Sequence, residues 1–362
     1  MKKLILIFIV LNFSCKSSND SQFVNRFINS NPKLLHILKN NDIQVKLTVI
    51  DSIENFIEYE YNTDVDRYFY PASTVKLPIA LFALEKLNEN KILSIETPFM
   101  LEDDTLKTTF KNELEKVFIL SDNQANNRFF EFIGQDYINK KFKSKGFFNS
   151  TIFHRLSTSN SSELEGKRVD FFTNDSIISF QKTNKEPQKL QLLNIKKGKG
   201  YINSVGKVIK KEMDFSEKNY ISIKDLHRIM KILFFPEKFN KEERFNLTNE
   251  QREILFNYMS GYPKDFGYSP EEFPYYFNKF FIYGDKKLEF DGDIIIYNKV
   301  GFAYGQLSDV AFIKKNNVAI ILTATIDVNT NKIYNDDKYD YDSIGFPFLA
   351  EISREIIKTL SN

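Results

Sequence analysis

The sequence predicts an α+β protein in which an antiparallel β-sheet is flanked by helices and a helical lobe is inserted into the chain. Two observations support this class. Stretches of strand length lie near both ends of the sequence, two before residue 62 and three after residue 293. Segments with helical spacing of apolar residues fill the region between them, and one more ends the chain. This order is typical of a fold whose sheet is built from both ends of the chain.

The composition is that of an ordinary globular protein and excludes several classes of function. Hydrophobic residues make up 42% and charged residues 27% of the 362 residues. The 50 basic residues scarcely exceed the 48 acidic ones, whereas nucleic-acid binding usually requires a clear basic excess. A single Cys excludes an intramolecular disulfide and a Cys-based zinc site. The His residues (His36, His154 and His227) are scattered, and there is no Gly-rich phosphate loop, so we expect no metal and no cofactor.

The first residues of the chain predict an export signal. A basic start precedes the apolar run from Leu4 to Phe13, which is too short to span a bilayer and ends in Ser14 and Cys15. Because the only Cys lies where the run ends, residues 1–14 resemble a bacterial lipoprotein signal, in which Cys15 is lipidated. A plain cleaved signal or an uncleaved anchor is the alternative. We therefore expect an exported lipoprotein of the cell envelope that faces the periplasm or the cell surface. The mature chain would carry 48 basic and 48 acidic residues, so the excess of two comes from the signal.

Residues 15–39 predict a polar tether followed by an N-terminal helix, and residues 40–362 predict the main domain. Apolar residues from Phe23 to Leu38 have helical spacing, with a break expected near Pro32. Alternation predicts a strand from Val45 to Ile50 and a second from Phe56 to Tyr61, joined by a turn.

The inserted lobe and the end of the chain follow in order. Helical spacing predicts helices over 77–87, over 114–133 with an interruption at Ser121, and over 221–235 and 251–259. Pro78 removes a helical hydrogen bond and should kink the first of them. Three strands are expected over 294–300, 307–313 and 318–326, and a closing helix over 344–360.

A Lys-rich insertion is expected at about residues 175–215. Residues 182–211 hold nine Lys and one Glu, together with Gly198, Gly200 and Gly206. We interpret this segment as a solvated hairpin inserted between helices. The alternative is an electrostatic contact with an anionic surface.

Chemistry is indicated first by Ser73 and Lys76, which open a predicted helix after Tyr70-Pro71-Ala72. Residues three apart lie on one face of a helix. The positive end of the helix dipole favours negative charge that develops on Ser73. A partly desolvated Lys76 loses pKa and can accept the Ser73 proton. Alone, this Ser-x-x-Lys spacing is common by chance.

Two further motifs follow. Ser121-Asp122-Asn123 lies at the break between helical stretches, where its residue types also suit a plain helix N-cap. Lys299-Val300-Gly301 follows an apolar strand. Each motif alone is weak, but their order and their predicted contexts agree with the penicillin-recognising serine enzymes. The chain from about residue 40 to 360 resembles the class A β-lactamases and their serine-hydrolase relatives, including the penicillin-binding proteins.

The resemblance implies a role for each motif residue. Ser73 would be the acylated nucleophile, Lys76 its proton acceptor, and Ser121 the group that passes the proton to the leaving nitrogen. Asn123 would hydrogen-bond the substrate amide, Lys299 would attract the substrate carboxylate, and Gly301 would let the strand approach the substrate. The backbone N–H groups of Ser73 and Phe302 would form the oxyanion hole. Asp122 would accept backbone hydrogen bonds around its loop.

Two departures from the family pattern bear on turnover. Val300 stands where the family usually has Thr or Ser, so a hydroxyl that helps to bind the carboxylate is missing. The Glu-x-x-Leu-Asn loop, whose Glu activates the deacylating water, is absent from the corresponding residues 154–168. Glu163 or Glu165 could supply that base, or both could be solvated loop carboxylates.

Three functions remain open on the sequence. The first is an exported serine hydrolase that opens β-lactams through a Ser73 acyl-enzyme. The second is a penicillin-binding D-alanyl-peptidase, or an esterase, with slow deacylation. The third is a lipoprotein that binds a cell-wall ligand without turnover. The expected partners are a β-lactam or D-alanyl-peptide substrate and, through the lipid anchor, the membrane.

Overall fold

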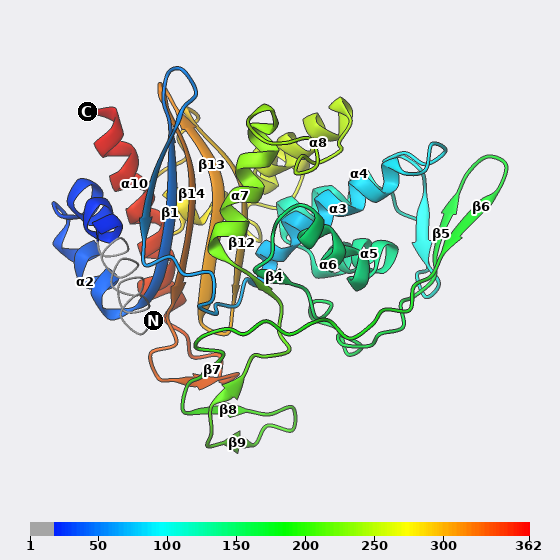
Figure 1. Ribbon diagram of the computed structural model, residues 1–362, viewed down its shortest axis with the longest axis horizontal. Coiled ribbons are helices and arrows are strands. Elements are labelled where there is room, and N and C mark those ends of the chain that lie inside the picture. Colours follow the sequence, from blue (N-terminus) through cyan, green and yellow to red (C-terminus); the bar gives the residue numbers. More distant parts are fainter. Residues whose placement is uncertain (1–17) are drawn as a thin grey trace, which may run out of the picture.

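The computed structural model describes residues 18–362 and centres on one antiparallel sheet (Figure 1). The predicted signal and Cys15 lie outside the described residues. The five strands follow the order β12-β13-β14-β1-β2. Their bounds are β1 Asp42–Ile50, β2 Phe56–Tyr61, β12 Ile294–Ala303, β13 Gln306–Lys315 and β14 Val318–Asp327. Asp42 pairs with Asp327, so both ends of the chain meet in the sheet as the sequence predicts.

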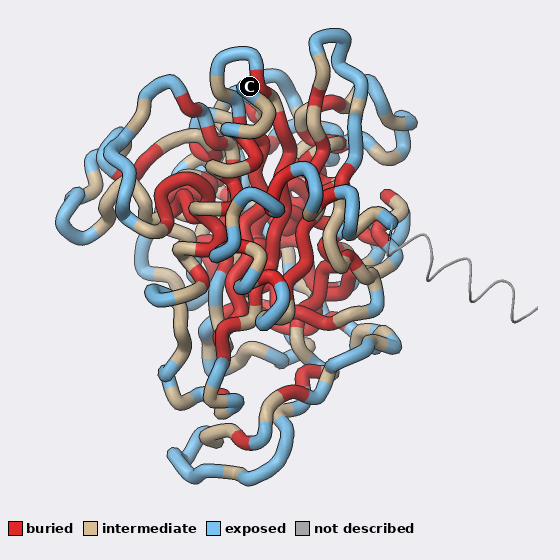
Figure 2. Tube along the Cα trace, turned by 90° about the vertical axis from the view of Figure 1, so that its left-hand side faces the viewer, coloured by how far each residue is buried: buried red, intermediate tan, exposed pale blue. Residues whose placement is uncertain are grey.

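Helices cover both faces of this sheet, and each face has its own core. The terminal helix α10 (Phe346–Ser361) packs on β13 and β14 together with η1 (Val24–Ile28), α2 (Pro32–Asn40) and α9 (Phe280–Tyr283). On the opposite face lie α7 (Ile223–Phe234) and α8 (Asn249–Ser260). Residues of β13 alternate between the cores: Val310 and Phe312 belong to one, Ala311 and Ile313 to the other. A strand covered on both faces is buried along most of its length (Figure 2).

The helical lobe continues the second core away from the sheet. It contains η2 (Ala72–Val75), α3 (Lys76–Asn88), α4 (Phe110–Glu115), η3 (Lys116–Leu120), α5 (Asn123–Ile133) and α6 (Gln135–Ser144). Pro78 does not interrupt the helix, because α3 runs without a break from Lys76 to Asn88. Pro78 is the third residue of this helix, where the backbone amide has no helical partner in any case.

Short strands and turns complete the described chain. A small sheet of β3 (Phe99–Leu101), β5 (Val169–Phe172) and β6 (Ile177–Phe180) projects from the helical lobe (Figure 1). The remaining elements are β4 Ser150–Thr151, β7 Lys196–Lys197, β8 Gly200–Ile202, β9 Val208–Ile209, β10 Met213–Asp214, β11 Tyr220–Ile221, β15 Ile333–Tyr334, η4 Pro236–Lys238, η5 Pro263–Phe266 and η6 Tyr341–Gly345.

The Lys-rich segment forms short ladders below the sheet in the view of Figure 1. β7 pairs with β10, and β8 pairs both with β9 and with β15, which precedes an acidic stretch. Lys199, Lys207, Lys210 and Lys211 are exposed. Within residues 18–362, no helix has the length and apolar character needed to cross a membrane.

Candidate active site

Ser73 lies in a tight helical turn that the chain enters through an unusual backbone conformation. Ala72, the first residue of the 3₁₀ turn η2, has φ +46°, a value that L-residues rarely adopt. The Thr74 hydroxyl donates a 2.7 Å hydrogen bond to the Pro71 carbonyl and fixes this turn. Ala72 and Thr74 are buried, whereas Ser73 is partly exposed. The turn therefore presents the hydroxyl of Ser73 and hides its neighbours.

Gly301 brings β12 against the backbone of this turn. A Cβ atom at Gly301 would lie 2.8 Å from the amide nitrogens of both Ser73 and Thr74, and 2.7 Å from the Pro71 oxygen. No other residue type fits at that separation. Gly301 thus allows β12 to lie close to the backbone around the candidate nucleophile, and the predicted approach of this strand to a substrate stays a prediction.

Lys76 and Lys299 converge on Ser121. The Lys76 amine donates to the Ser121 carbonyl and lies 3.3 Å from its hydroxyl oxygen, and the Lys299 amine lies 2.7 Å from the same oxygen. Lys299 also donates a 2.9 Å hydrogen bond to the Val300 carbonyl. Ser121 adopts a left-handed conformation, φ +55°, at the end of η3, which turns its side chain and carbonyl toward the lysines. Residues from three distant parts of the sequence are therefore joined at one hydroxyl.

The electrostatics of this cluster favour a neutral amine. Both lysine side chains are fully buried. Burial lowers the pKa of Lys76 to about 7, although Asp122 opposes the shift. Burial and the neighbouring Lys76 also lower the pKa of Lys299 well below its ordinary value. A Lys76 amine with a pKa near neutrality can accept a proton at neutral pH, which is the property that a general base requires.

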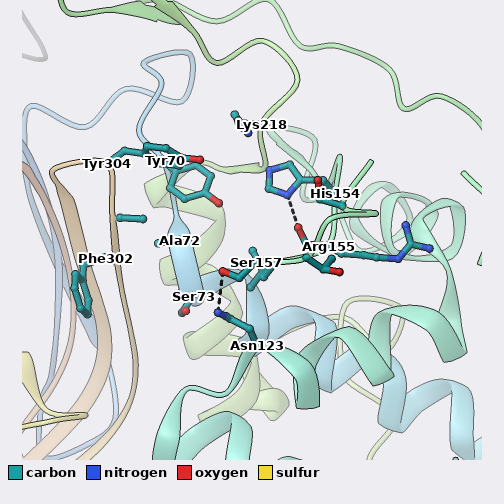
Figure 3. A pocket seen from close by; sticks show the side chains of 14 residues that line it. Tyr70, Ala72, Ser73, Asn123, His154, Arg155, Ser157, Lys218, Phe302 and Tyr304 are labelled. Carbon is teal, nitrogen blue, oxygen red and sulfur yellow. Dashed lines mark hydrogen bonds between the residues drawn. The ribbon is translucent and has the colours of Figure 1, made fainter. Parts of the chain in front are cut away.

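The other two residues of the second motif have different roles: Asp122 stabilises a helix end, and Asn123 lines a cavity. Asp122 caps α5, and its carboxylate accepts a 2.7 Å hydrogen bond from the Ala125 amide. This is the structural role that the sequence suggests for Asp122. The Asn123 side chain instead donates a 3.0 Å hydrogen bond to the Ser157 hydroxyl at the edge of the cavity (Figure 3).

A cavity of about 320 Å³ opens in front of Ser73 (Figure 3). It takes in the predicted residues Ser73, Asn123 and Phe302, while Lys76, Ser121, Lys299 and Gly301 are not among its lining residues. The full lining comprises Tyr70, Ala72, Ser73, Asn123, His154, Arg155, Leu156, Ser157, Thr158, Ser161, Lys218, Phe302, Ala303 and Tyr304. None of these carries a carboxylate.

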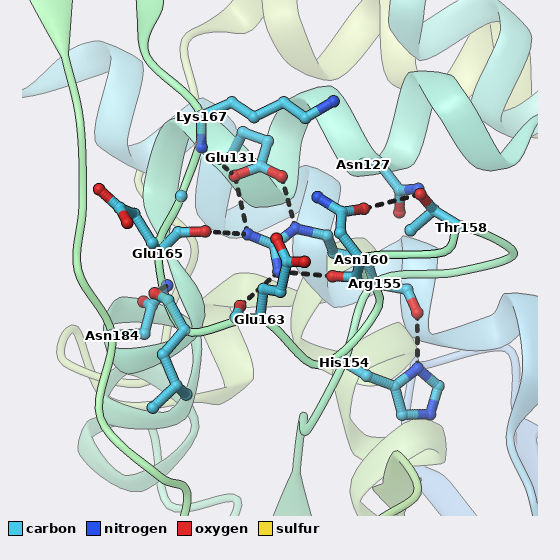
Figure 4. A network of polar contacts seen from close by, with 12 residues as sticks. Asn127, Glu131, His154, Arg155, Thr158, Asn160, Glu163, Glu165, Lys167 and Asn184 are labelled. Atoms are coloured by element: carbon cyan, nitrogen blue, oxygen red, sulfur yellow. Dashed lines mark hydrogen bonds and ion pairs between the residues drawn. The ribbon is translucent and has the colours of Figure 1, made fainter.

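The structure does not bring Glu163 or Glu165 to this cavity. Both side chains are exposed, and both residues contribute only backbone carbonyls to the interior of the loop. These carbonyls accept hydrogen bonds from the Arg155 guanidinium at 2.6 and 3.1 Å. The same guanidinium forms an ion pair with the buried Glu131 (Figure 4). The loop is thus organised around a buried cation, which turns the two predicted carboxylates outward.

Most of the cavity lining was not predicted from the sequence, including four residues with large polar or aromatic side chains. His154, Lys218, Tyr70 and Tyr304 line the side of the cavity opposite Asn123 (Figure 3). They belong to loops, and no motif or periodicity marks them. Among residues 18–362 there is no group of three or more His, Cys, Asp or Glu side chains suited to a metal ion.

This fold is that of the class A β-lactamases. A class A β-lactamase from Bacteroides cellulosilyticus superposes with a TM-score of 0.56 at 14% identity, covering 95% of this chain and 99% of the other. A β-lactamase from Streptomyces albus G gives 0.53 at 12%, with 91% and 99% covered. PBP-A gives 0.54 at 15%, with 91% and 97% covered. No curated protein sequence matches the chain.

The sequence itself identifies the family. The model of the beta-lactamase enzyme family matches residues 31–360, nearly the whole chain. The chain therefore belongs to the beta-lactamase enzyme family, and the family resemblance drawn from the three motifs is confirmed.

Proposed function

We propose that the protein is a serine hydrolase that β-lactams acylate at Ser73 and that releases the acyl group slowly. The Ser73 oxygen would form a bond to the β-lactam carbonyl carbon, and the lactam C–N bond would break. The proton of the Ser73 hydroxyl would pass through Lys76 and Ser121 to the departing nitrogen. Atoms and charges then balance without any other reactant.

The arrangement around Ser121 supports the acylation half of this proposal. A proton relay needs a base with a pKa near neutrality and a hydroxyl in contact with it. Lys76, with its pKa of about 7, lies 3.3 Å from the Ser121 hydroxyl. Lys299 lies 2.7 Å from that hydroxyl on the other side, where its amine would meet a substrate carboxylate. A carboxylate placed there would favour the charged form of Lys299.

Slow release rests on a single observation: no lining residue of the cavity is an Asp or Glu. Hydrolysis of the acyl-enzyme needs a second base beside a water molecule. Ser157 is the partner of Asn123, and its hydroxyl is a poor base at neutral pH. Val300 acts on substrate binding instead, since a missing hydrogen bond to the carboxylate is worth roughly 1.5–3 kcal/mol.

The same observation favours a second candidate, a peptidase that acts on D-alanyl peptides or an esterase. Such an enzyme shares the acylation machinery, and a β-lactam then acts on it as a slowly released inhibitor. A ligand-binding protein without turnover is less well supported, because binding alone does not require a proton relay between Lys76 and Ser121.

Intact-mass measurement after mixing with benzylpenicillin tests the proposal. We expect the mass to rise by one whole penicillin molecule and to return to its original value slowly. The Ser73→Ala variant should show no increase. Absence of an adduct on the wild type contradicts the proposed acylation. Rapid loss of the adduct, with fast colour change of a chromogenic cephalosporin, contradicts slow release and indicates a full β-lactamase.

A further inference from the structure

The cavity contains a cation without a counter-ion. Lys218 lines it, and no carboxylate of the described residues lies within ion-pair distance of the Lys218 amine. The Lys218 amine lies over the ring of Tyr304, 5.9 Å from the ring centroid. The other basic lining residue, Arg155, is neutralised by Glu131. The cavity therefore presents one uncompensated positive charge.

Aromatic side chains connect this cation to a buried imidazole. Tyr304 meets Tyr70 edge to face at 5.0 Å, and Tyr70 stacks on His154 at 6.5 Å with nearly parallel rings. Figure 3 shows the four side chains together on one side of Ser73, with Asn123 and Ser157 on the other. They form a compact wall at one end of the cavity.

His154 in this wall has one unsatisfied hydrogen-bonding atom. The side chain is more than nine-tenths buried, and its Nδ1 lies 2.5 Å from the Arg155 carbonyl. A carbonyl only accepts, so Nδ1 carries the proton and Nε2 carries the lone pair. Nε2 has no partner among the described residues, and the surrounding side chains cover it. Burial, with a smaller contribution from Lys218, lowers the pKa of His154 to about 4, so the ring is neutral at neutral pH.

We infer that Lys218 forms a subsite for an acyl group that carries a free carboxylate, beside the wall that Tyr304, Tyr70 and His154 complete. The carboxylate of the acyl group would accept a hydrogen bond from the Lys218 amine. This inference rests on the proposed function for the location of the acyl group, and it adds the class of substrate. That class is an acidic acyl donor, such as a peptide with a free side-chain carboxylate, in preference to a neutral one.

Two penicillins that differ by one group provide the test. Benzylpenicillin and carbenicillin share the ring system and the amide, and carbenicillin has one additional carboxylate on the side-chain carbon. Their dissociation constants are measured by calorimetry on the Ser73→Ala background, where no acyl-enzyme can form. We expect carbenicillin to bind about tenfold more tightly, the scale of one partly exposed charge-assisted hydrogen bond.

Variants at Lys218 test whether this residue causes the preference for carbenicillin over benzylpenicillin. Lys218→Met should abolish the difference between the two penicillins, and Lys218→Arg should retain it. Lys211→Met, which removes an exposed lysine outside the cavity, should leave it unchanged. Equal binding of both penicillins, absence of binding by either, or a preference that survives Lys218→Met overturns the subsite. Because this experiment measures binding only, its outcome is distinct from a failure of Ser73 acylation, which the wild-type mass measurement reports.

Discussion

At the scale of single residues, the protonation of Lys76 should control the acylation rate. Burial lowers the pKa of Lys76 to about 7, so its neutral, proton-accepting form predominates above that pH and disappears below it. We predict that the acylation rate rises roughly tenfold per pH unit below about pH 7 and levels off above it. Stopped-flow measurement with a chromogenic cephalosporin from pH 5.5 to 8.5 checks this.

The Lys76→Ala variant should lower the acylation rate by about 10²–10⁴-fold, the usual range for general acid–base catalysis. Lys111→Ala removes an exposed lysine of the same lobe and should have no effect. A flat pH profile in the wild type would show that another group takes the Ser73 proton.

Gly301 yields a second prediction at this scale. In Gly301→Ala the added methyl group meets backbone atoms at 2.7–2.8 Å, so β12 must move away from η2. Overpacking of this kind costs about 1–3 kcal/mol of unfolding free energy. We also expect the acylation rate to fall at least about tenfold, because the displaced Phe302 amide belongs to the expected oxyanion hole. Chemical denaturation and adduct formation measure the two effects.

Gly292→Ala is the matched control, because its added Cβ would approach no closer than 3.9 Å to another atom. It should leave both stability and acylation near the wild-type values. If Gly301→Ala behaves in the same way, the tight contact between β12 and η2 is unimportant for the site.

What the sequence reveals about the site depends on whether a residue belongs to a spaced motif. Ser73, Ser121 and Lys299 occur in short patterns whose chemistry is recognisable; the structure joins Lys76 and Lys299 at Ser121 and places Ser73 on the neighbouring cavity. His154 and Lys218 reach the cavity only because separate loops bring them there, so neither spacing nor periodicity marks them. Glu163 and Glu165 have a plausible residue type, but the orientation of their side chains depends on Arg155, a distant effect that no local pattern encodes.

At the scale of elements, the loop of residues 154–166 depends on one buried ion pair. The side chains of Arg155 and Glu131 are 1% and 2% exposed. We predict that Arg155→Met lowers the free energy of unfolding by about 3–5 kcal/mol, because it leaves the Glu131 charge buried without its partner. Urea denaturation followed by circular dichroism measures this.

Arg168→Met provides the comparison, since Arg168 is half exposed where it pairs with Asp170. An exposed pair contributes about 0–1 kcal/mol, so this variant should remain close to the wild type. Equal destabilisation by both substitutions would mean that burial of the Arg155 pair has no special effect.

Elements with strong periodicity are predicted best. The strand Phe56–Tyr61 has the expected bounds, and α3, α7 and α8 differ from expectation by two residues or fewer at each end. Helix α6 (Gln135–Ser144) escapes prediction because only Ile138 and Phe142 supply buried apolar side chains, in a segment otherwise rich in polar residues. The two-residue strands depend on pairing with distant partners, so their own sequences carry little signal.

At the scale of the whole molecule, attachment to a membrane should depend on Cys15 alone. The expected mature chain has equal numbers of acidic and basic residues, so its net charge provides no general attraction to an anionic surface. We predict that a fatty-acid analogue labels the wild type in a bacterial host and that Cys15→Ala is unlabelled and leaves the membrane fraction. Equal labelling of both would exclude the lipid anchor.

The pairing of β1 with β14 has a consequence for how the protein is made. Residues 42–50 are synthesised early, yet one edge of β1 stays open until residues 318–327 have emerged. The contact of Gly301 with the turn at Ser73 likewise spans most of the sequence. Contacts so distant along the chain form slowly, and an unpaired strand edge is prone to aggregation. We therefore expect that synthesis has to run nearly to its end before the surroundings of Ser73 are complete, and that a chain cut short before β14 forms neither the five-stranded sheet nor the candidate site.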